Sequence, residues 1–467
     1  MKGGLSALTA GVAAAFLSLP FLASQTTAQG LVTISETQAE AVKNAQSVQD
    51  TRPSLAGFLD REKGLIPGDA VAYALMHNAA MLAARKEVDA ARALVMQAGL
   101  RPNPTLSLGG SRQANGRDNT ILAEGTLPLE LGGRRTARVS VAERELEVRQ
   151  SMAEDLERRL AIETSRKFGE ALSAILKLGF VEDMLTSTRR AYRLVAQRVE
   201  EGRVAPLEEN VVLVEVNRLR SMRETSKGKA EVAMLELRNL MGMNPETQLR
   251  LRGDFTDMTA PALTLSAATA RALAKRPDLL AGRAAERVAE GQIEQARAEG
   301  RLDAGLRAGY QRTNMGFPLN GITDAGQLRP VQDVFNFLTF GVTISLPVRN
   351  KNQGAVEAAV AGAEAAKQRR EFLELTVRRE VATAYARYEH AARAMEIYRV
   401  GVREQASANL EVVRKTYELG AKTLLDYLAE QRRFIEVEFA YIDALLDTYL
   451  ARVEIEGATA SPELVQK

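Results

Sequence analysis

The same unusual arrangement of residues occurs twice in this sequence. A stretch with alternating apolar residues ends in Leu127-Pro128-Leu129, passes through Gly132-Gly133-Arg134-Arg135 and leads directly into a very long charged segment. Further along, a second alternating stretch ends in Leu346-Pro347-Val348, passes through Asn350-Lys351-Asn352-Gln353-Gly354 and leads into another such segment. A strand that turns sharply into a long helix, present in duplicate, is rare in compact enzymes and restricts the folds open to this chain.

The segments before these two junctions also match each other. Ala74-Leu75 corresponds to Ala272-Leu273, and Gln97-Ala98 to Gln295-Ala296, in an alignment without gaps. Self-similarity of this kind indicates an internal duplication. We therefore expect two repeats, at 67–255 and 256–456, preceded by a signal peptide (1–28) and a loosely ordered periplasmic extension (29–66) and followed by a short tail (457–467).

Residues 1–28 have the pattern of a secretory signal. Lys2 precedes an apolar run from Leu5 to Ala23, and Thr26-Thr27-Ala28 supplies small residues for cleavage. A retained N-terminal anchor helix is the alternative. Later segments of the sequence fall short of the roughly 18–20 apolar residues of a transmembrane helix. An exported chain of this kind is periplasmic or is a β-type outer-membrane protein.

Composition argues against several other classes of protein. Lys and Arg (62) nearly balance Asp and Glu (59), so the chain lacks the basic excess expected of a nucleic-acid partner. The absence of cysteine excludes disulfides, thiolate metal sites and a lipidated N-terminal Cys. Aromatic residues make up only 5% of the sequence, and Ala, Glu, Arg, Leu and Val dominate long stretches. Such a mixture is typical of extended helices packed side by side.

The alternating stretches predict four strands, at about 104–112, 120–129, 303–312 and 338–346. Apolar residues of the last strand, such as Phe340 and Val342, alternate with Thr and Gly. The segments Gln113–Asn119 and Thr313–Val334 are rich in Gly, Asn and Asp and are expected to be hairpin loops. A soluble sheet is the alternative, but its wet face would carry Lys and Glu rather than Gly, Thr and Ser. Membrane strands are therefore favoured.

Four strands cannot close a barrel in a membrane. Unpaired backbone groups in hydrocarbon each cost several kcal/mol, so a membrane sheet must close on itself. Two chains would give a small barrel filled by side chains, and three would give an open pore of twelve strands. Under this interpretation the protein must be an oligomer.

Two long helical hairpins are predicted to follow the junctions. The segment from Arg134 to Glu200 contains no Pro and has apolar residues at helical spacing, which corresponds to a helix about 100 Å long. The chain then turns at Gly202 and returns through Leu207–Met241. The second repeat predicts a helix over 355–419, a turn at Gly420 and a return over 425–450.

Taken together, these residues resemble the TolC family of outer-membrane efflux proteins over positions 67–456. The Pro128–Arg135 and Leu346–Gly354 stretches are similar to that family's two strand-to-helix junctions, most of all in its heavy-metal (cobalt–zinc–cadmium) branch. The resemblance implies a mainly α chain with membrane β: a homotrimer whose twelve-stranded barrel lies in outer-membrane lipid and continues into an α-helical periplasmic tunnel. It also implies docking to a periplasmic adaptor (membrane fusion) protein and a proton-driven (RND-type) inner-membrane pump. The absent N-terminal Cys and the long 313–334 segment depart from the pattern.

The candidate functional residues fall into three groups, with no catalytic group, cofactor or metal site among them. His77 and His390 are expected to be surface or packing residues. The residues of the hairpin turns, given below as docking tips, could instead form ordinary αα-hairpin caps. The acidic residues, given below as entrance acids, could instead be solvated ion-pair partners. The groups are the junctions Pro128, Gly132, Gly133, Pro347, Asn350, Asn352 and Gly354, the adaptor-docking tips Gly202, Leu207, Gly420 and Leu425, and the entrance acids Glu208, Glu209 and Asp426.

The favoured function is the outer-membrane channel of a tripartite efflux system that exports divalent heavy-metal cations. A channel for drugs or for type I protein secretion has the same architecture and remains an alternative. A periplasmic coiled-coil adaptor would carry one hairpin between compact β-domains, whereas this sequence predicts two hairpins, each after a Pro-terminated strand pair. An enzyme is disfavoured because the sequence contains no catalytic constellation.

Overall fold

The computed structural model describes residues 55–60, 62–255 and 263–460. All of them belong to the compact unit Ser54–Lys467. The predicted signal peptide, most of the predicted extension and the last seven residues lie outside the described residues. The described elements are η1 (Leu55–Gly57), α2 (Pro67–His77), α3 (Ala79–Ala98), β1 (Thr105–Arg112), β2 (Asn119–Pro128), α4 (Arg134–Glu200), α5 (Pro206–Met241), α6 (Leu265–Lys275), α7 (Pro277–Glu299), β3 (Asp303–Ile322), β4 (Leu328–Ser345), α8 (Gln353–Ile397), η2 (Tyr398–Val402), α9 (Arg403–Glu418) and α10 (Leu424–Ala458).

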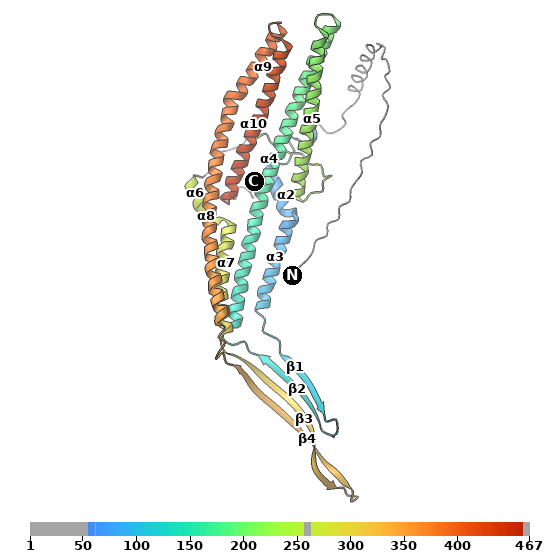
Figure 1. Ribbon diagram of the computed structural model, residues 1–467, viewed down its shortest axis with the longest axis vertical. Helices are drawn as coiled ribbons and strands as arrows, with labels where there is room; N and C mark the ends of the chain where they lie inside the picture. Colours follow the sequence, from blue (N-terminus) through green and yellow to red (C-terminus); the bar gives the residue numbers. More distant parts are fainter. Residues whose placement is uncertain (1–54, 61, 256–262, 461–467) are drawn as a thin grey trace, which may run out of the picture. The chain divides into compact units, whose positions relative to one another are not determined.

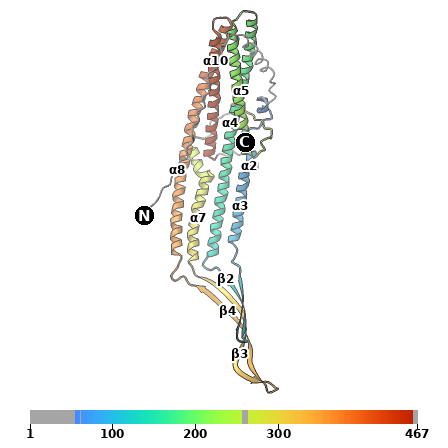
Figure 2. The same cartoon turned by 45° about the vertical axis from the view of Figure 1, so that its right-hand side comes forward.

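Within this unit, the sheet lies at one end of the long helices and the hairpin turns lie at the other (Figures 1 and 2). The four strands pair antiparallel in the order β1-β2-β3-β4. In one row of partners, Leu108 faces Ala123, Ala123 faces Tyr310 and Tyr310 faces Leu338. The apolar side chains thus share one face, as the alternation predicts. Most sheet residues are exposed, and within the described part of the chain β1 and β4 each have one edge without a partner strand.

The predicted hairpin loop over 313–334 is wrong for most of its length. Strand β3 continues to Ile322, β4 begins at Leu328, and the two remain paired there. Two of the residues that suggested a loop, Gly316 and Asn320, flank a register shift, where a strand pair accommodates irregular backbone. The β3–β4 ribbon therefore extends beyond the β1–β2 turn (Figure 1).

The long helices are confirmed, with one difference in the second hairpin. Helix α4 runs unbroken from Arg134 to Glu200 and returns as α5. The predicted helix over 355–419 is confirmed, with a π-helical turn of five residues, Tyr398–Val402, between α8 and α9. Directly after this turn, Arg403 Nε donates to Glu438 Oε2 on α10 at 2.7 Å. The π-helical turn therefore lies next to a hydrogen bond that connects α9 to α10.

The main hydrophobic core lies where α4 passes α2 and α5. Phe168 and Ile175 of α4 are buried there with Met241 of α5, Leu251 and Phe58. The prediction that 29–66 is loosely ordered is wrong for its described end, because the Leu251 backbone N–H donates to the Phe58 carbonyl at 2.8 Å. This backbone pairing and the burial of Phe58 fix the end of the segment to the core.

None of the described helices is both long enough and apolar enough to cross a membrane.

Candidate functional site

The first strand-to-helix junction uses left-handed backbone at three positions. Pro128 is the last residue of β2, and the Leu129 N–H donates to the Ala304 carbonyl at 2.9 Å. Glu130, Gly132 and Gly133 then have φ values of 49°, 76° and 82°. Glycine adopts such dihedrals at little cost, which agrees with the predicted role of the two glycines. The chain is thereby turned from the sheet into α4.

Arginines that follow the glycines attach this junction to the ends of α3 and α7. Arg134 donates to the Glu299 carbonyl at 2.8 Å and pairs with Asp303 at 2.8 Å. Arg138 donates to the Ala98 carbonyl at 2.9 Å. The last carbonyls of a helix have no partner within the helix, and basic side chains satisfy them well. Sequence reasoning missed this role, although basic residues directly after the paired glycines were the signal for it.

Arg138 also holds the carboxylate of the strained Glu130. Its Nη1 lies 2.6 Å from Glu130 Oε1. The hydrogen bond from Arg138 lowers the pKa of Glu130 below its ordinary value. The ion pair links the segment between β2 and α4 to the second turn of α4.

The second junction also turns the chain from the sheet into a helix, with left-handed backbone at an asparagine in place of a glycine. Asn352 has a φ of 61°, and its side-chain amide donates to the Ala296 carbonyl at the end of α7 at 2.8 Å. Its backbone N–H donates to Asn350 Oδ1 at 2.9 Å. The expectation that Gly354 has unusual dihedrals is wrong, because it lies within α8 and left-handed backbone is found at Asn352 instead. Pro347 follows the end of β4 at Ser345.

The two hairpin tips have the same turn geometry. Gly202 and Gly420 are left-handed, with φ values of 71° and 76°. The N–H of Arg203 donates to the Arg198 carbonyl, and the N–H of Ala421 donates to the Thr416 carbonyl, both at 2.9 Å. This pattern closes the C-terminus of a helix and requires a residue that tolerates positive φ. The glycines are thus explained by the turn alone.

The leucines after these turns are not explained by the turn. Leu207 is 70% exposed and Leu425 is 66% exposed. The adjacent Leu424 is buried beside Val195 and Val212. Other residues therefore form the packing within the tips, and one leucine of each tip is exposed to solvent.

The candidate entrance acids all lie near the tips, but two of them have structural partners. The Tyr192 hydroxyl donates to Glu209 Oε1 at 2.9 Å. Asp426 forms a capping box with Thr423 at the start of α10, and these hydrogen bonds lower the pKa of its carboxyl. Glu208 is half-buried at the start of α5. The structure brings the acids to one end of the hairpins without joining them in one cluster.

A buried ion-pair cluster joins the two hairpins further from the tips. Glu215 of α5 is completely buried and accepts from Arg218 at 2.6 Å and from Arg432 of α10 at 2.8 Å. Nearby, Gln431 of α10 donates to Thr188 of α4 at 2.8 Å. Sequence reasoning missed this polar layer, because a Glu in a charged helix gives no sign that it will face inward.

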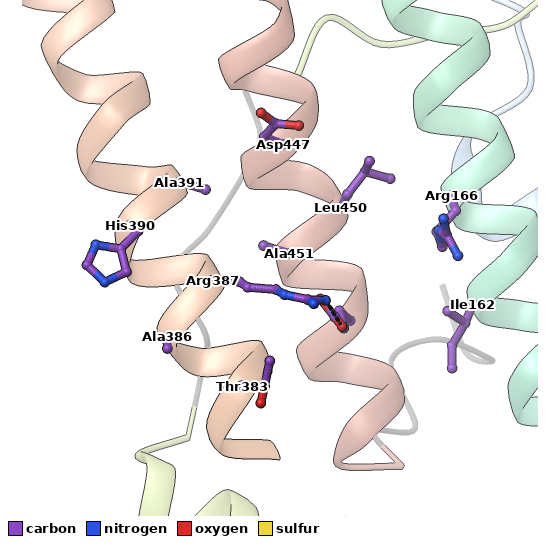
Figure 3. A pocket seen from close by; sticks show the side chains of 11 residues that line it. Ile162, Arg166, Thr383, Ala386, Arg387, His390, Ala391, Asp447, Leu450 and Ala451 are labelled. Atoms are coloured by element: carbon purple, nitrogen blue, oxygen red, sulfur yellow. Dashed lines mark hydrogen bonds and ion pairs between the residues drawn. The ribbon is translucent and has the colours of Figure 1, made fainter. Parts of the chain in front are cut away.

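A pocket of about 880 Å³ lies between α4, α8 and α10 (Figure 3). Arg387 on its wall pairs with Glu454 at 2.6 Å, while the ring of His390 points away from the other side chains (Figure 3). Burial, and then the nearby Asp443, raise the pKa of Asp447. Within the described ranges, no group of three or more His, Asp or Glu side chains could hold a metal ion.

A sheet whose strands run directly into two long helical hairpins is the fold of outer-membrane channel proteins. The sequence model of the family described as "Outer membrane efflux protein" matches residues 71–243 and 268–461. This chain therefore belongs to the outer membrane efflux protein family, whose members are channels and not enzymes. The predicted fold class and the resemblance to the TolC family are confirmed.

Individual relatives agree with this assignment over most of the chain. The cobalt-zinc-cadmium resistance protein CzcC of Cupriavidus metallidurans is 24% identical over 417 residues, which cover 88% of this chain and 94% of the relative. A structure of the channel CusC has a TM-score of 0.69 at 16% identity and covers 88% of this chain and 95% of that one. A membrane protein from Pseudomonas aeruginosa has a TM-score of 0.68 at 22% identity, covering 87% and 92%.

Proposed function

We propose that this protein is the outer-membrane channel of a tripartite, proton-driven (RND-type) efflux system and acts as a homotrimer. The observation that carries the proposal is the exposed four-stranded sheet, in which the edges of β1 and β4 have no partner strand among the residues that the structure describes. Unpaired strand edges in hydrocarbon cost several kcal/mol per group, so copies of the chain must complete the sheet. Three copies give an open barrel in outer-membrane lipid, and the helical hairpins continue it as a tunnel into the periplasm.

Divalent heavy-metal cations are the proposed cargo. The similarity to a cobalt-zinc-cadmium resistance protein over 88% of the chain supports this class of cargo. The arrangement of the acids agrees with it, because Glu208, Glu209 and Asp426 lie near the tips and are not gathered into a tight site. Ions can pass through a channel quickly only where binding is weak enough to release them.

Growth of a deletion strain tests the cargo. Loss of the channel is expected to lower the tolerated concentration of zinc, cobalt or cadmium severalfold and to leave tolerance of hydrophobic drugs unchanged. The opposite pattern would identify a drug channel. Unchanged tolerance of both would contradict an efflux role in that strain.

Adaptor docking at the tips is the second part of the proposal. Leu207 and Leu425 occupy matching places after the two turns and are largely exposed. Two exposed leucines at equivalent places on the tips offer apolar contact points to another protein. The partner proposed here is a periplasmic adaptor whose helical hairpin presents an apolar stripe to the tips.

Replacing both leucines by serine, Leu207→Ser with Leu425→Ser, is expected to abolish metal resistance without reducing the amount of channel in the outer membrane. Two exposed leucines contribute little to folding, so the loss arises at the contact. Lys422→Ser removes another exposed side chain from the same turn and should preserve resistance. Full resistance in the double variant, at equal protein level, would exclude these leucines as docking residues.

A further inference from the structure

The two faces of the sheet differ sharply in chemistry. One row on the polar face contains Ser107, Glu124, Gly309 and Thr339, in register across the four strands. Arg307, in the next row of the same face, forms an ion pair with Glu124 at 3.2 Å. In a closed barrel the apolar face meets lipid and this polar face lines the water-filled interior.

Phenylalanines interrupt the polar face at the end remote from the junctions. Phe335 lies opposite Thr313, and Phe337 lies opposite Gln311, so both belong to the polar face by register. Their rings are stacked, with centroids 6.4 Å apart. Phe337 is 50% exposed. Large apolar rings on the water side of an otherwise small and polar surface need a function other than lipid contact.

A third ring reaches this place from the extended part of the β3–β4 ribbon. Phe317 lies four residues beyond Thr313, the partner of Phe335, so about 13 Å would separate Phe317 from Phe335 along a straight ribbon. Their ring centroids are only 6.2 Å apart, in an edge-to-face arrangement. The two side chains therefore lean toward each other over the polar face, and a bend of the ribbon toward that face would bring them together. The register shift after Gly316 permits the bend, and Asp118 of the β1–β2 turn accepts from the Gly316 N–H at 2.7 Å.

We propose that Phe317, Phe335 and Phe337 form an apolar collar inside the outer mouth of the barrel. The proposal rests on the channel function above, because three copies are needed to place nine rings around one opening. An apolar constriction resists the entry of water and hydrated solutes. The collar is thus the part of the channel that limits backward entry of hydrophilic molecules from outside the cell.

The absence of native cysteine allows a direct test in whole cells with the full-length chain. Ser107→Cys places a thiol on the polar face, further inside than the collar, and its labelling by a bulky membrane-impermeant maleimide is measured from outside. Adding Phe335→Ser and Phe337→Ser is expected to increase the labelling rate roughly fivefold or more, because the apolar constriction is lost. Equal rates in the two backgrounds would overturn the proposal.

Two controls separate this proposal from the channel function itself. Asp324→Cys, in the turn between β3 and β4, should be labelled at the same rate in both backgrounds. Failure to label Asp324→Cys in intact cells would contradict the outer-membrane topology and hence the proposed function. If the double serine variant does not assemble, Phe337→Trp carries the test: the larger ring should slow labelling of Ser107→Cys, and an unchanged rate overturns the collar.

Discussion

Replacing Arg218 and Arg432 together by methionine is expected to destabilise the protein by about 3–5 kcal/mol, the cost of leaving a buried carboxylate without its partners. The side chain of Glu215 has 0% exposure, whereas both arginines reach solvent. Water can solvate the arginines if the ion pairs are lost, whereas the buried carboxylate of Glu215 has only the arginines to compensate its charge. Because Arg432 belongs to α10 and Glu215 to α5, the loss also removes one of the contacts between the two hairpins. The free energy of unfolding, measured by denaturant titration in detergent, gives the effect.

The matched control adds Glu215→Gln to the double methionine variant. Glutamine has nearly the same shape and removes the buried charge, so a large part of the lost stability should return. Arg432→Met alone should cost less, since Arg218 still donates to Glu215 at 2.6 Å. A double variant as stable as the wild type would show that the carboxylate finds water or another partner.

The pH dependence of this effect follows from the pKa of Glu215. Burial raises that pKa, but hydrogen bonds from Arg218 and Arg432 outweigh burial, and the net shift is below the ordinary value of 4.5. A carboxyl with a depressed native pKa contributes stability above its unfolded pKa and loses it as pH falls through the native pKa. The stability difference between wild type and Glu215→Gln should therefore be full at neutral pH and shrink below about pH 4.5.

The backbone architecture was predictable because its signals are periodic. Alternation indicated the strands, and the Pro-free segment after Arg134 indicated a helix that ends at Glu200, as found. Left-handed backbone at Gly132 and Gly133 was also predictable, since glycine is the residue that favours it. These features depend on residues close together in the sequence.

Features that depend on distant residues escaped prediction. The inward position of Glu215 is set by Arg432, far along the chain. The strand pairing of 313–322 depends on a partner strand beyond the turn and overrides the loop signals of Gly and Asn. Asn352, and not Gly354, is left-handed because its side chain also binds the Ala296 carbonyl. In each case a tertiary contact decides between local conformations that the sequence allows equally.

Gly300, directly after α7, lies very close to the backbone of the second junction. This residue follows α7, and a Cβ atom built on it would lie 2.2 Å from the Lys351 carbonyl oxygen and 2.9 Å from the Lys351 carbonyl carbon. Both are backbone atoms of the turn that leads into α8. That turn is fixed by the hydrogen bond from Asn352 to the end of the same helix at 2.8 Å. The neighbour therefore cannot move away as a flexible side chain would.

Gly300→Ala is accordingly expected to destabilise the protein by about 3 kcal/mol or more, at the upper end of overpacking effects, and to reduce the amount of assembled channel in the outer membrane. Gly99 ends α3 in the first repeat as Gly300 ends α7, and a Cβ there would lie 3.3 Å from its nearest neighbour. Gly99→Ala should therefore have a much smaller effect. Gly354 is the second residue of α8 and has open space around it, so Gly354→Ala should stabilise slightly, by less than the roughly 0.5–1 kcal/mol of a mid-helix glycine. Thermal unfolding of the purified variants ranks them, and equal stability of Gly300→Ala and Gly99→Ala would show that the second junction can shift as a unit. The expected order of stability follows from how far the atoms that meet the new methyl group can move. The backbone next to Gly300 is held between two helices and can move least, whereas the methyl group at Gly354 meets only solvent.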